Sequence, residues 1–157
     1  MRVLSFWLDS KFHPPSEEEI LAWAHDPNSS LANDEWDYDF EHWIFGDKTE
    51  TDRHLSFILH LAVDTECRER ARNSIAHVLG LHAEILIAEE KMEEIDSFLK
   101  TLSSQSDQNL DDVVHKYKEI LSLPRSWRQR AMMDGIKTAR EQMAKAEKDG
   151  WWSPDKN

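Results

Sequence analysis

An apolar residue recurs every three or four positions over residues 81–102, and this spacing constrains the fold more than any other feature of the chain. The positions are Leu81, Ile85, Ala88, Met92, Ile95, Leu99 and Leu102. Steps of four and three place side chains on one side of an α-helix, as in the seam along which two helices pack. The spacing therefore predicts one long helix laid against another helix.

A second seam of the same kind runs through the C-terminal part of the chain. Its apolar positions are Met132, Ile136, Ala139, Met143 and Ala146. It ends before Gly150, and glycine is common just after the C-terminus of a helix. Two long seams predict antiparallel packing of two long helices within a bundle. The same seams also suit a homodimer, so the pattern is compatible with a monomer or a homodimer.

Shorter helices are predicted before and between the two seams. Ser16 and Glu19 form a capping box that starts one helix, and Thr51 caps another. A length of 157 residues is typical of one domain. We therefore predict an all-α fold: a single-domain bundle of about six helices over residues 1–157, with its helical core over residues 51–150.

Acidic residues are concentrated in the first third of the chain. Residues 1–52 contain 13 acidic and 3 basic residues, whereas residues 53–157 contain 18 acidic and 16 basic residues. A surface with charge of one sign steers association with an oppositely charged molecule. Negative charge disfavours direct binding to nucleic acid or to an anionic membrane. We therefore expect a basic protein as the partner, with no direct contact to nucleic acid or membrane.

Acidic and aromatic residues alternate closely within segment 12–47. Between Lys11 and Lys48 lie ten carboxylates and neither a lysine nor an arginine. Residues 33–45 fit a strand or a helix, and we favour a helix, because Trp36, Phe40 and Trp43 then share an inward face. Aromatic residues often anchor binding energy at interfaces. The predicted partner-binding residues are Asp34, Glu35, Asp37, Tyr38, Asp39, Glu41 and Asp47.

The chain contains one cysteine, Cys67, so it cannot form an internal disulfide. The apolar run over residues 1–8 is too short for a signal peptide or a membrane span. We therefore expect the protein in the cytosol. Cys67 is interpreted as a packed thiol without a catalytic role.

Possible metal ligands occur only as pairs, namely His25 with Asp26, His60 with Asp64, and Asp39 with His42. Two ligands do not make a metal site, so we interpret these residues as ion pairs or helix caps. The chain also lacks a phosphate-binding glycine loop and a nucleophile motif. We therefore expect no metal, no cofactor and no catalytic residue.

Residues 72–77, with the sequence Arg-Asn-Ser-Ile-Ala-His, resemble the Arg-Asn-x-x-x-His motif of the HEPN ribonucleases, which are small all-helical proteins. The resemblance implies that Arg72 and His77 of two protomers would cleave RNA without a metal. Val78 stands where that family often has glycine. We keep this metal-independent ribonuclease as the minority interpretation.

Two further segments, 36–40 and 60–70, resemble small all-helical bacterial immunity proteins of polymorphic toxin systems. Those proteins combine an acidic aromatic segment with a Leu-Ala-x-Asp-x-x-Cys pattern, which residues 61–67 match. The resemblance implies a cognate inhibitor that binds a toxin, and many such toxins are nucleases. A nucleic-acid mimic that inhibits a restriction or CRISPR enzyme would use the same carboxylates and is the alternative.

Overall fold

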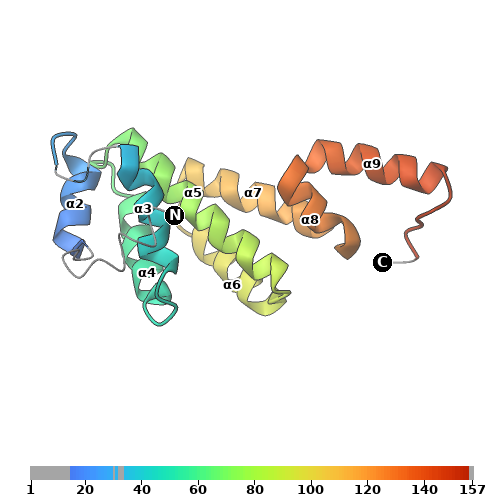
Figure 1. Ribbon diagram of the computed structural model, residues 1–157, viewed down its shortest axis with the longest axis horizontal. Coiled ribbons are helices and arrows are strands. Elements are labelled where there is room, and N and C mark those ends of the chain that lie inside the picture. The colour runs from blue at the N-terminus through green and yellow to red at the C-terminus, as the bar shows by residue number, and fades with distance from the viewer. Residues whose placement is uncertain (1–14, 30, 32–33, 156–157) are drawn as a thin grey trace. The chain divides into compact units, whose positions relative to one another are not determined.

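The computed structural model describes residues 15–29, 31 and 34–155, and for residues 34–39 it describes the backbone only (Figure 1). Every regular element in these ranges is an α-helix, which confirms the all-α prediction. The helices are α2 (Glu17–His25), α3 (Asp34–Phe45), α4 (Thr51–Ala62), α5 (Glu69–Ala88), α6 (Met92–Ser103), α7 (Gln108–Ser122), α8 (Arg125–Asp134) and α9 (Ile136–Lys148). None of these helices has both the length and the apolar character needed to cross a membrane.

The chain divides into two compact units, and the division falls within α5. Unit 1 comprises Met1–Leu79 and unit 2 comprises Gly80–Asn157. Each unit has its own set of packed helices, so each is described by itself. The single domain over residues 1–157 stays a prediction.

The core of unit 1 forms where α2 and α3 pack against α4. From α3 it buries Phe40, Trp43 and Ile44, which lie three and four positions apart on one helical face. The ring of Phe40 lies 5.1 Å from that of Trp23 in α2 and 6.2 Å from that of Trp43. The choice of helix over strand for this segment is therefore confirmed over Asp34–Phe45, as is the inward position of Phe40 and Trp43. The side chain of Trp36 lies outside the described residues.

In unit 2, α6 packs against α7, α7 against α8, and α8 against α9. The helices α6 and α7 contribute a shared apolar core of Ile95, Leu99, Leu102, Leu110, Val114, Tyr117 and Ile120. Helix α7 begins after Asp107, whose side chain accepts a hydrogen bond from the backbone N–H of Leu110 at 3.1 Å. This contact satisfies one of the free N–H groups at the helix N-terminus.

Neither long seam forms one continuous helix, which corrects the prediction of two long helices. The first seam is divided between α5 and α6 at Glu90, whose φ of 59° lies in the left-handed region. The second is divided between α8 and α9 at Gly135, with a φ of 95°. The prediction failed because the spacing of apolar residues shows only which face of a helix is buried. Each break depends instead on the backbone conformation of a residue between two helices, Glu90 or Gly135, and the spacing carries no information on that conformation.

Candidate functional site

All seven predicted partner-binding residues lie in α3 or in the turn that follows it. Five of them, Asp34, Glu35, Asp37, Tyr38 and Asp39, have helical backbone, and their side chains lie outside the described residues. Glu41 is half-buried in α3, and Asp47 is exposed in the turn before α4. The structure thus places the predicted segment on one helix and describes the side chains of its C-terminal end.

A cavity of about 650 Å³ opens at this C-terminal end of α3. We call it the acidic pocket, and the lining residues that matter here are Glu17, Trp43, Asp47, Glu50, Arg53 and His54. They come from the start of α2, the end of α3, the turn that follows it and the start of α4. Three carboxylates and one guanidinium therefore line the cavity, together with the imidazoles of His42 and His54 and the indole of Trp43.

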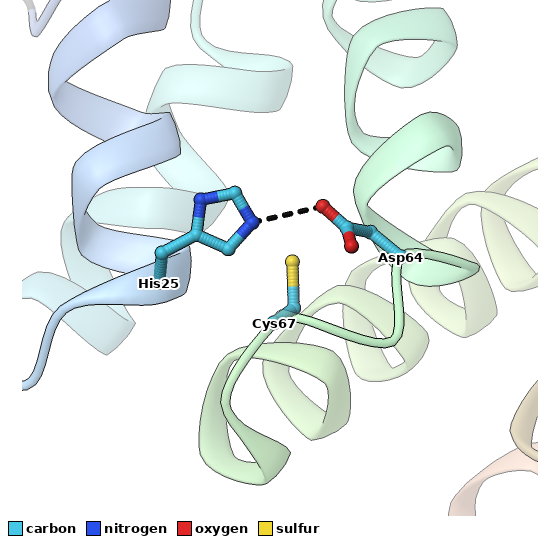
Figure 2. Close-up of side chains that lie close together, drawn as sticks. All are labelled: His25, Asp64 and Cys67. Atoms are coloured by element: carbon cyan, nitrogen blue, oxygen red, sulfur yellow. Dashed lines mark hydrogen bonds and ion pairs between the residues drawn. The ribbon is translucent and has the colours of Figure 1, made fainter.

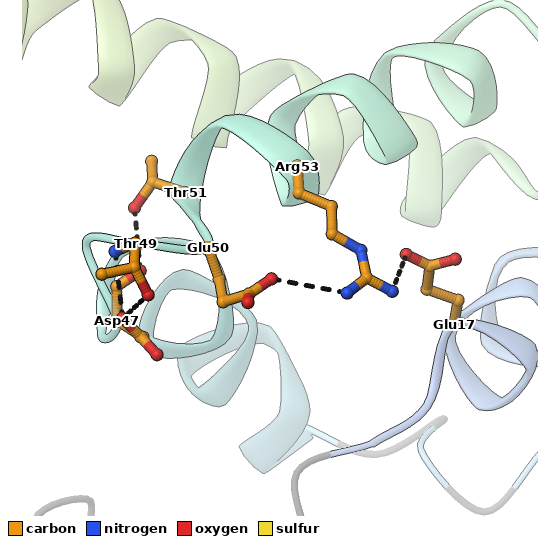
Figure 3. Close-up of polar contacts among 6 residues, drawn as sticks. All are labelled: Glu17, Asp47, Thr49, Glu50, Thr51 and Arg53. Carbon is orange, nitrogen blue, oxygen red and sulfur yellow. Dashed lines mark hydrogen bonds and ion pairs between the residues drawn. The ribbon is translucent and has the colours of Figure 1, made fainter.

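Arg53 joins two of these carboxylates (Figure 3). Its guanidinium nitrogens lie 3.3 Å from Oε1 of Glu17 and 3.5 Å from Oε2 of Glu50. Glu17 belongs to the first turn of α2 and Glu50 directly precedes α4, so the guanidinium spans the two helix starts. All three side chains are partly exposed, so these ion pairs contribute little to stability and remain available for exchange with another cation.

Asp47 is held as an ionised carboxylate by Thr49 in the turn after α3 (Figure 3). Its Oδ1 accepts hydrogen bonds from the hydroxyl of Thr49 at 2.7 Å and from the backbone N–H of Thr49 at 3.0 Å. The side-chain bond, followed by the backbone bond, lowers the pKa of Asp47 from its usual 3.8. Asp47 therefore carries its negative charge at neutral pH.

An aromatic stack forms part of the pocket wall. The imidazole of His54 lies nearly parallel to the indole of Trp43, with the ring centroids 3.8 Å apart. Burial lowers the pKa of His54 below its usual 6.5, so the imidazole is neutral at pH 7. The Trp43–His54 stack therefore adds no positive charge, and three carboxylates stand against the one guanidinium of Arg53.

A second polar cluster lies at the other end of α2, where Arg68 fixes the helix C-terminus. The backbone N–H of Arg68 donates to the carbonyl of Ala24 at 2.8 Å, and its Nε donates to the carbonyl of Trp23 at 3.1 Å. The last carbonyls of a helix have no partner within the helix, so these bonds satisfy them. They also hold the loop after α4 against the end of α2.

This arrangement brings His25, Asp64 and Cys67 together (Figure 2). Nε2 of His25 lies 2.8 Å from Oδ2 of Asp64, while Oδ1 of Asp64 accepts from the backbone N–H of Glu66 at 2.9 Å. The Glu66 bond first, and then His25, lower the pKa of Asp64 from 3.8. Burial and the neighbouring Asp64 carboxylate raise the pKa of the Cys67 thiol to about 11. The thiol is therefore protonated and a poor nucleophile at neutral pH.

The two residues of the ribonuclease-like motif lie on the part of α5 that belongs to unit 1. Nε2 of His77 lies 3.2 Å from Oε1 of Glu41, and both side chains are partly exposed. Arg72 is half-buried, and its Nε has no hydrogen-bond partner among the atoms that the structure describes. A catalytic role for Arg72 and His77 stays a prediction.

Sequence reasoning missed the partner of His25 and the residues that complete the acidic pocket. His25 was paired with Asp26, but Oδ1 of Asp26 accepts from the backbone N–H of Asn28 at 2.8 Å instead. The Leu-Ala-x-Asp-x-x-Cys pattern does mark Asp64 and Cys67, which share a turn, whereas no local pattern connects them to His25. Comparisons with protein-family models, curated proteins and solved structures found no match.

Proposed function

We propose that this chain binds a basic protein and blocks it in a stoichiometric complex, as an immunity protein blocks its cognate bacterial toxin. The observation that carries the proposal is the acidic pocket at the end of α3, with Glu17, Asp47 and Glu50 beside the Trp43–His54 stack. The pocket combines negative charge with an aromatic wall, and both features favour a lysine or arginine side chain.

The charge balance of the pocket leaves room for one more cation. Its three carboxylates outnumber the single guanidinium of Arg53. His54 is neutral at pH 7 and adds no positive charge. An arginine from a partner would pair with Asp47 and compete with Arg53 for Glu50, while its planar group stacks near the aromatic wall. A cavity of about 650 Å³ has the size of a small-molecule site, so it accommodates one long side chain.

The acidic first third of the chain would act before this contact forms. Opposite charges on two proteins speed their encounter, and the specific contacts made afterwards slow dissociation. The carboxylates of Asp34, Glu35, Asp37, Asp39 and Glu41 precede the pocket along α3 and are proposed to supply this steering. Glu41 also lies beside His77, so it is a poor choice for a test of steering alone.

The first test captures the partner with three tagged chains. The surface variant changes Asp37, Asp39 and Asp47 to lysine, and the control variant makes the same change of charge at Glu141, Glu147 and Asp155, which are exposed residues of unit 2. Lysate of the source organism is passed over each chain, and circular dichroism checks the fold. Wild type and control should capture the same basic protein and the surface variant should not.

The captured protein also decides between the two inhibitor classes. A toxin domain supports the immunity function, whereas a restriction or CRISPR enzyme points to nucleic-acid mimicry. Equal capture of the protein by all three chains would contradict an acidic interface in unit 1.

A second test distinguishes the contribution of the pocket to binding from that of the other carboxylates of α3. Glu17→Gln combined with Glu50→Gln removes two pocket carboxylates and keeps similar side-chain shapes. We expect the affinity for the captured protein to fall more than about tenfold, or about 1.4 kcal/mol. Glu141→Gln with Glu147→Gln is the matched control, and calorimetric titration is the measurement. Equal affinities of the two double variants would exclude the pocket as the binding site.

A further inference from the structure

The cluster of His25, Asp64 and Cys67 is a second site, which the proposed partner binding does not use. One donor atom from each side chain lies within 4.8 Å of the other two (Figure 2). The three residues come from the end of α2 and from the turn between α4 and α5. We propose that they bind one zinc ion, with a water molecule as the fourth ligand.

The set of donors selects the metal. An imidazole nitrogen, a thiolate sulfur and a carboxylate oxygen are the three kinds of protein ligand that zinc takes. Calcium and magnesium prefer sites made of oxygen atoms, so a thiolate disfavours them. The thiolate of Cys67 and the carboxylate of Asp64 together balance the double positive charge of the ion.

The geometry requires a small rearrangement of the cluster. Tetrahedral zinc at about 2.0–2.3 Å from each ligand places the ligand atoms about 3.3–3.8 Å apart. At present Nε2 of His25 lies 2.8 Å from Oδ2 of Asp64, and the three donor atoms all lie within 4.8 Å of one another. His25 is exposed, so its ring can turn away from Asp64 and admit the ion.

The two other ligands are fixed by the turn in which they lie. The backbone N–H of Cys67 donates to the carbonyl of Asp64 at 3.1 Å, and Oδ1 of Asp64 accepts from the backbone N–H of Glu66. Oδ2 of Asp64 is then the oxygen that faces His25. This turn therefore presents a carboxylate and a thiol side by side before any metal binds, which lowers the entropy lost on binding.

Zinc binding would release one proton from the thiol. The S–H bond of Cys67 breaks, its electron pair forms the bond to zinc and the proton passes to solvent. Asp64 and burial oppose the thiolate in the metal-free protein, whereas the positive charges of Arg72 and Arg68 favour it. Because zinc binding releases this proton, zinc affinity should increase with pH.

The experiment uses cobalt(II) as a spectroscopic probe and zinc as its competitor, with the full chain after treatment with a chelator. Cys67 is the only cysteine, so a thiolate-to-cobalt charge-transfer band reports on this residue alone. Wild type should show this band with one equivalent of cobalt, together with the intense visible absorption of a tetrahedral ion. One equivalent of zinc should remove both.

Three variants test the identity of the site. Cys67→Ser should abolish the band. His25→Gln should weaken cobalt and zinc binding more than about tenfold, because losing a metal ligand reduces affinity at least as much as losing a residue that only orients a ligand. His25 is exposed, so this second variant tests the site even where Cys67→Ser fails to fold. His60→Gln, an exposed histidine of α4, is the matched control and should bind like wild type.

Thermal unfolding gives a readout that does not depend on the spectrum. Zinc should raise the melting temperature of wild type and of His60→Gln, since the ion would connect α2 to the turn after α4, and should raise that of His25→Gln less at the same zinc concentration. Absence of the charge-transfer band in wild type would overturn the proposal. A band of equal strength and affinity in His25→Gln would also overturn it.

Discussion

Polar contacts between residues distant in the sequence hold helices together in both units of this chain. In unit 1, His25 meets Asp64 and Glu41 meets His77, across 39 and 36 positions. In unit 2, the hydroxyl of Tyr117 meets Glu84, across 33 positions, and Arg125 pairs with Glu90. A contact within one turn supports only its own helix, whereas a distant contact fixes one element against another. Polar side chains therefore help to set the tertiary arrangement of each unit.

The units differ in charge and in the residues that form their cores. Unit 1 carries 16 acidic and 7 basic residues, and unit 2 carries 15 and 12. The aromatic core of unit 1 borders the acidic pocket, whereas α6 and α7 of unit 2 close on a mostly aliphatic core. The comparison suggests that unit 1 carries the binding chemistry and that unit 2 is a helical scaffold.

The largest expected effect is on the core of unit 1. Phe40 is fully buried between Trp23 and Trp43, so Phe40→Ala should lower the free energy of unfolding by about 3–5 kcal/mol. Denaturation in urea measures the change. Hydrogen exchange then shows whether the amides of α6 and α7 lose protection as well. A change below about 1 kcal/mol would contradict a tightly packed core around Phe40.

A distant polar contact also exists in unit 2, and its removal should cost less. The hydroxyl of Tyr117 in α7 donates to Oε1 of Glu84 in α5 at 2.8 Å. Tyr117→Phe should lower stability by about 1.5–3 kcal/mol, because the half-buried carboxylate loses its donor. Glu84→Gln keeps an acceptor and is the control, which should lose less stability than Tyr117→Phe. Equal losses would show that the charge of Glu84 matters more than the bond.

The same contact predicts a dependence on alkaline pH. Burial, followed by the Glu84 bond, raises the pKa of Tyr117 above its usual 10.0. The unfolded chain therefore loses this proton at a lower pH than the folded chain does. The stability that Tyr117 contributes should be present below pH 10 and be lost as the pH rises above it. Urea denaturation at several alkaline pH values should show this loss in wild type and a smaller one in Tyr117→Phe.

The break between α8 and α9 should depend on one glycine. Gly135 has a φ of 95° and a ψ of 154°, a conformation that residues with a side chain rarely adopt. Gly135→Ala should lower stability by about 1–3 kcal/mol through backbone strain, since no atom lies within 4 Å of the added Cβ. Urea denaturation measures this loss. Unchanged stability would show that α8 and α9 can join into the continuous helix that the seam predicted.

The smallest effect concerns acid stability in unit 1. The pKa of Asp64 is lowered, so the stability that this residue contributes is present above its unfolded value of 3.8 and is lost as the pH falls through the lower folded value. Asp64→Asn should reduce this loss in urea denaturation curves taken below pH 4. Asp155→Asn, at an exposed carboxylate of unit 2, is the control and should behave like wild type. The effect is small because Asp64 is partly exposed.

The sequence predicts helices well and their connections poorly. The apolar positions 36, 40, 43 and 44 favour helix over strand for the acidic segment, because burial on one face repeats with the turn of the helix, and positions 40, 43 and 44 are buried as this pattern predicts. The same rule could not detect the break at Glu90, a polar residue whose conformation the surrounding contacts decide. The cluster of His25, Asp64 and Cys67 was missed for a related reason, since it exists only once α2 packs beside the turn after α4.

The most direct test of the binding function of unit 1 is the association rate constant with the captured partner at several salt concentrations. Wild type and the unit 2 control with lysine at positions 141, 147 and 155 should associate quickly at low salt and slow steeply as salt screens the acidic surface. The surface variant with lysine at positions 37, 39 and 47 should associate slowly at every salt concentration. Equal rates and equal salt dependence for all three chains would contradict the assignment of binding to unit 1.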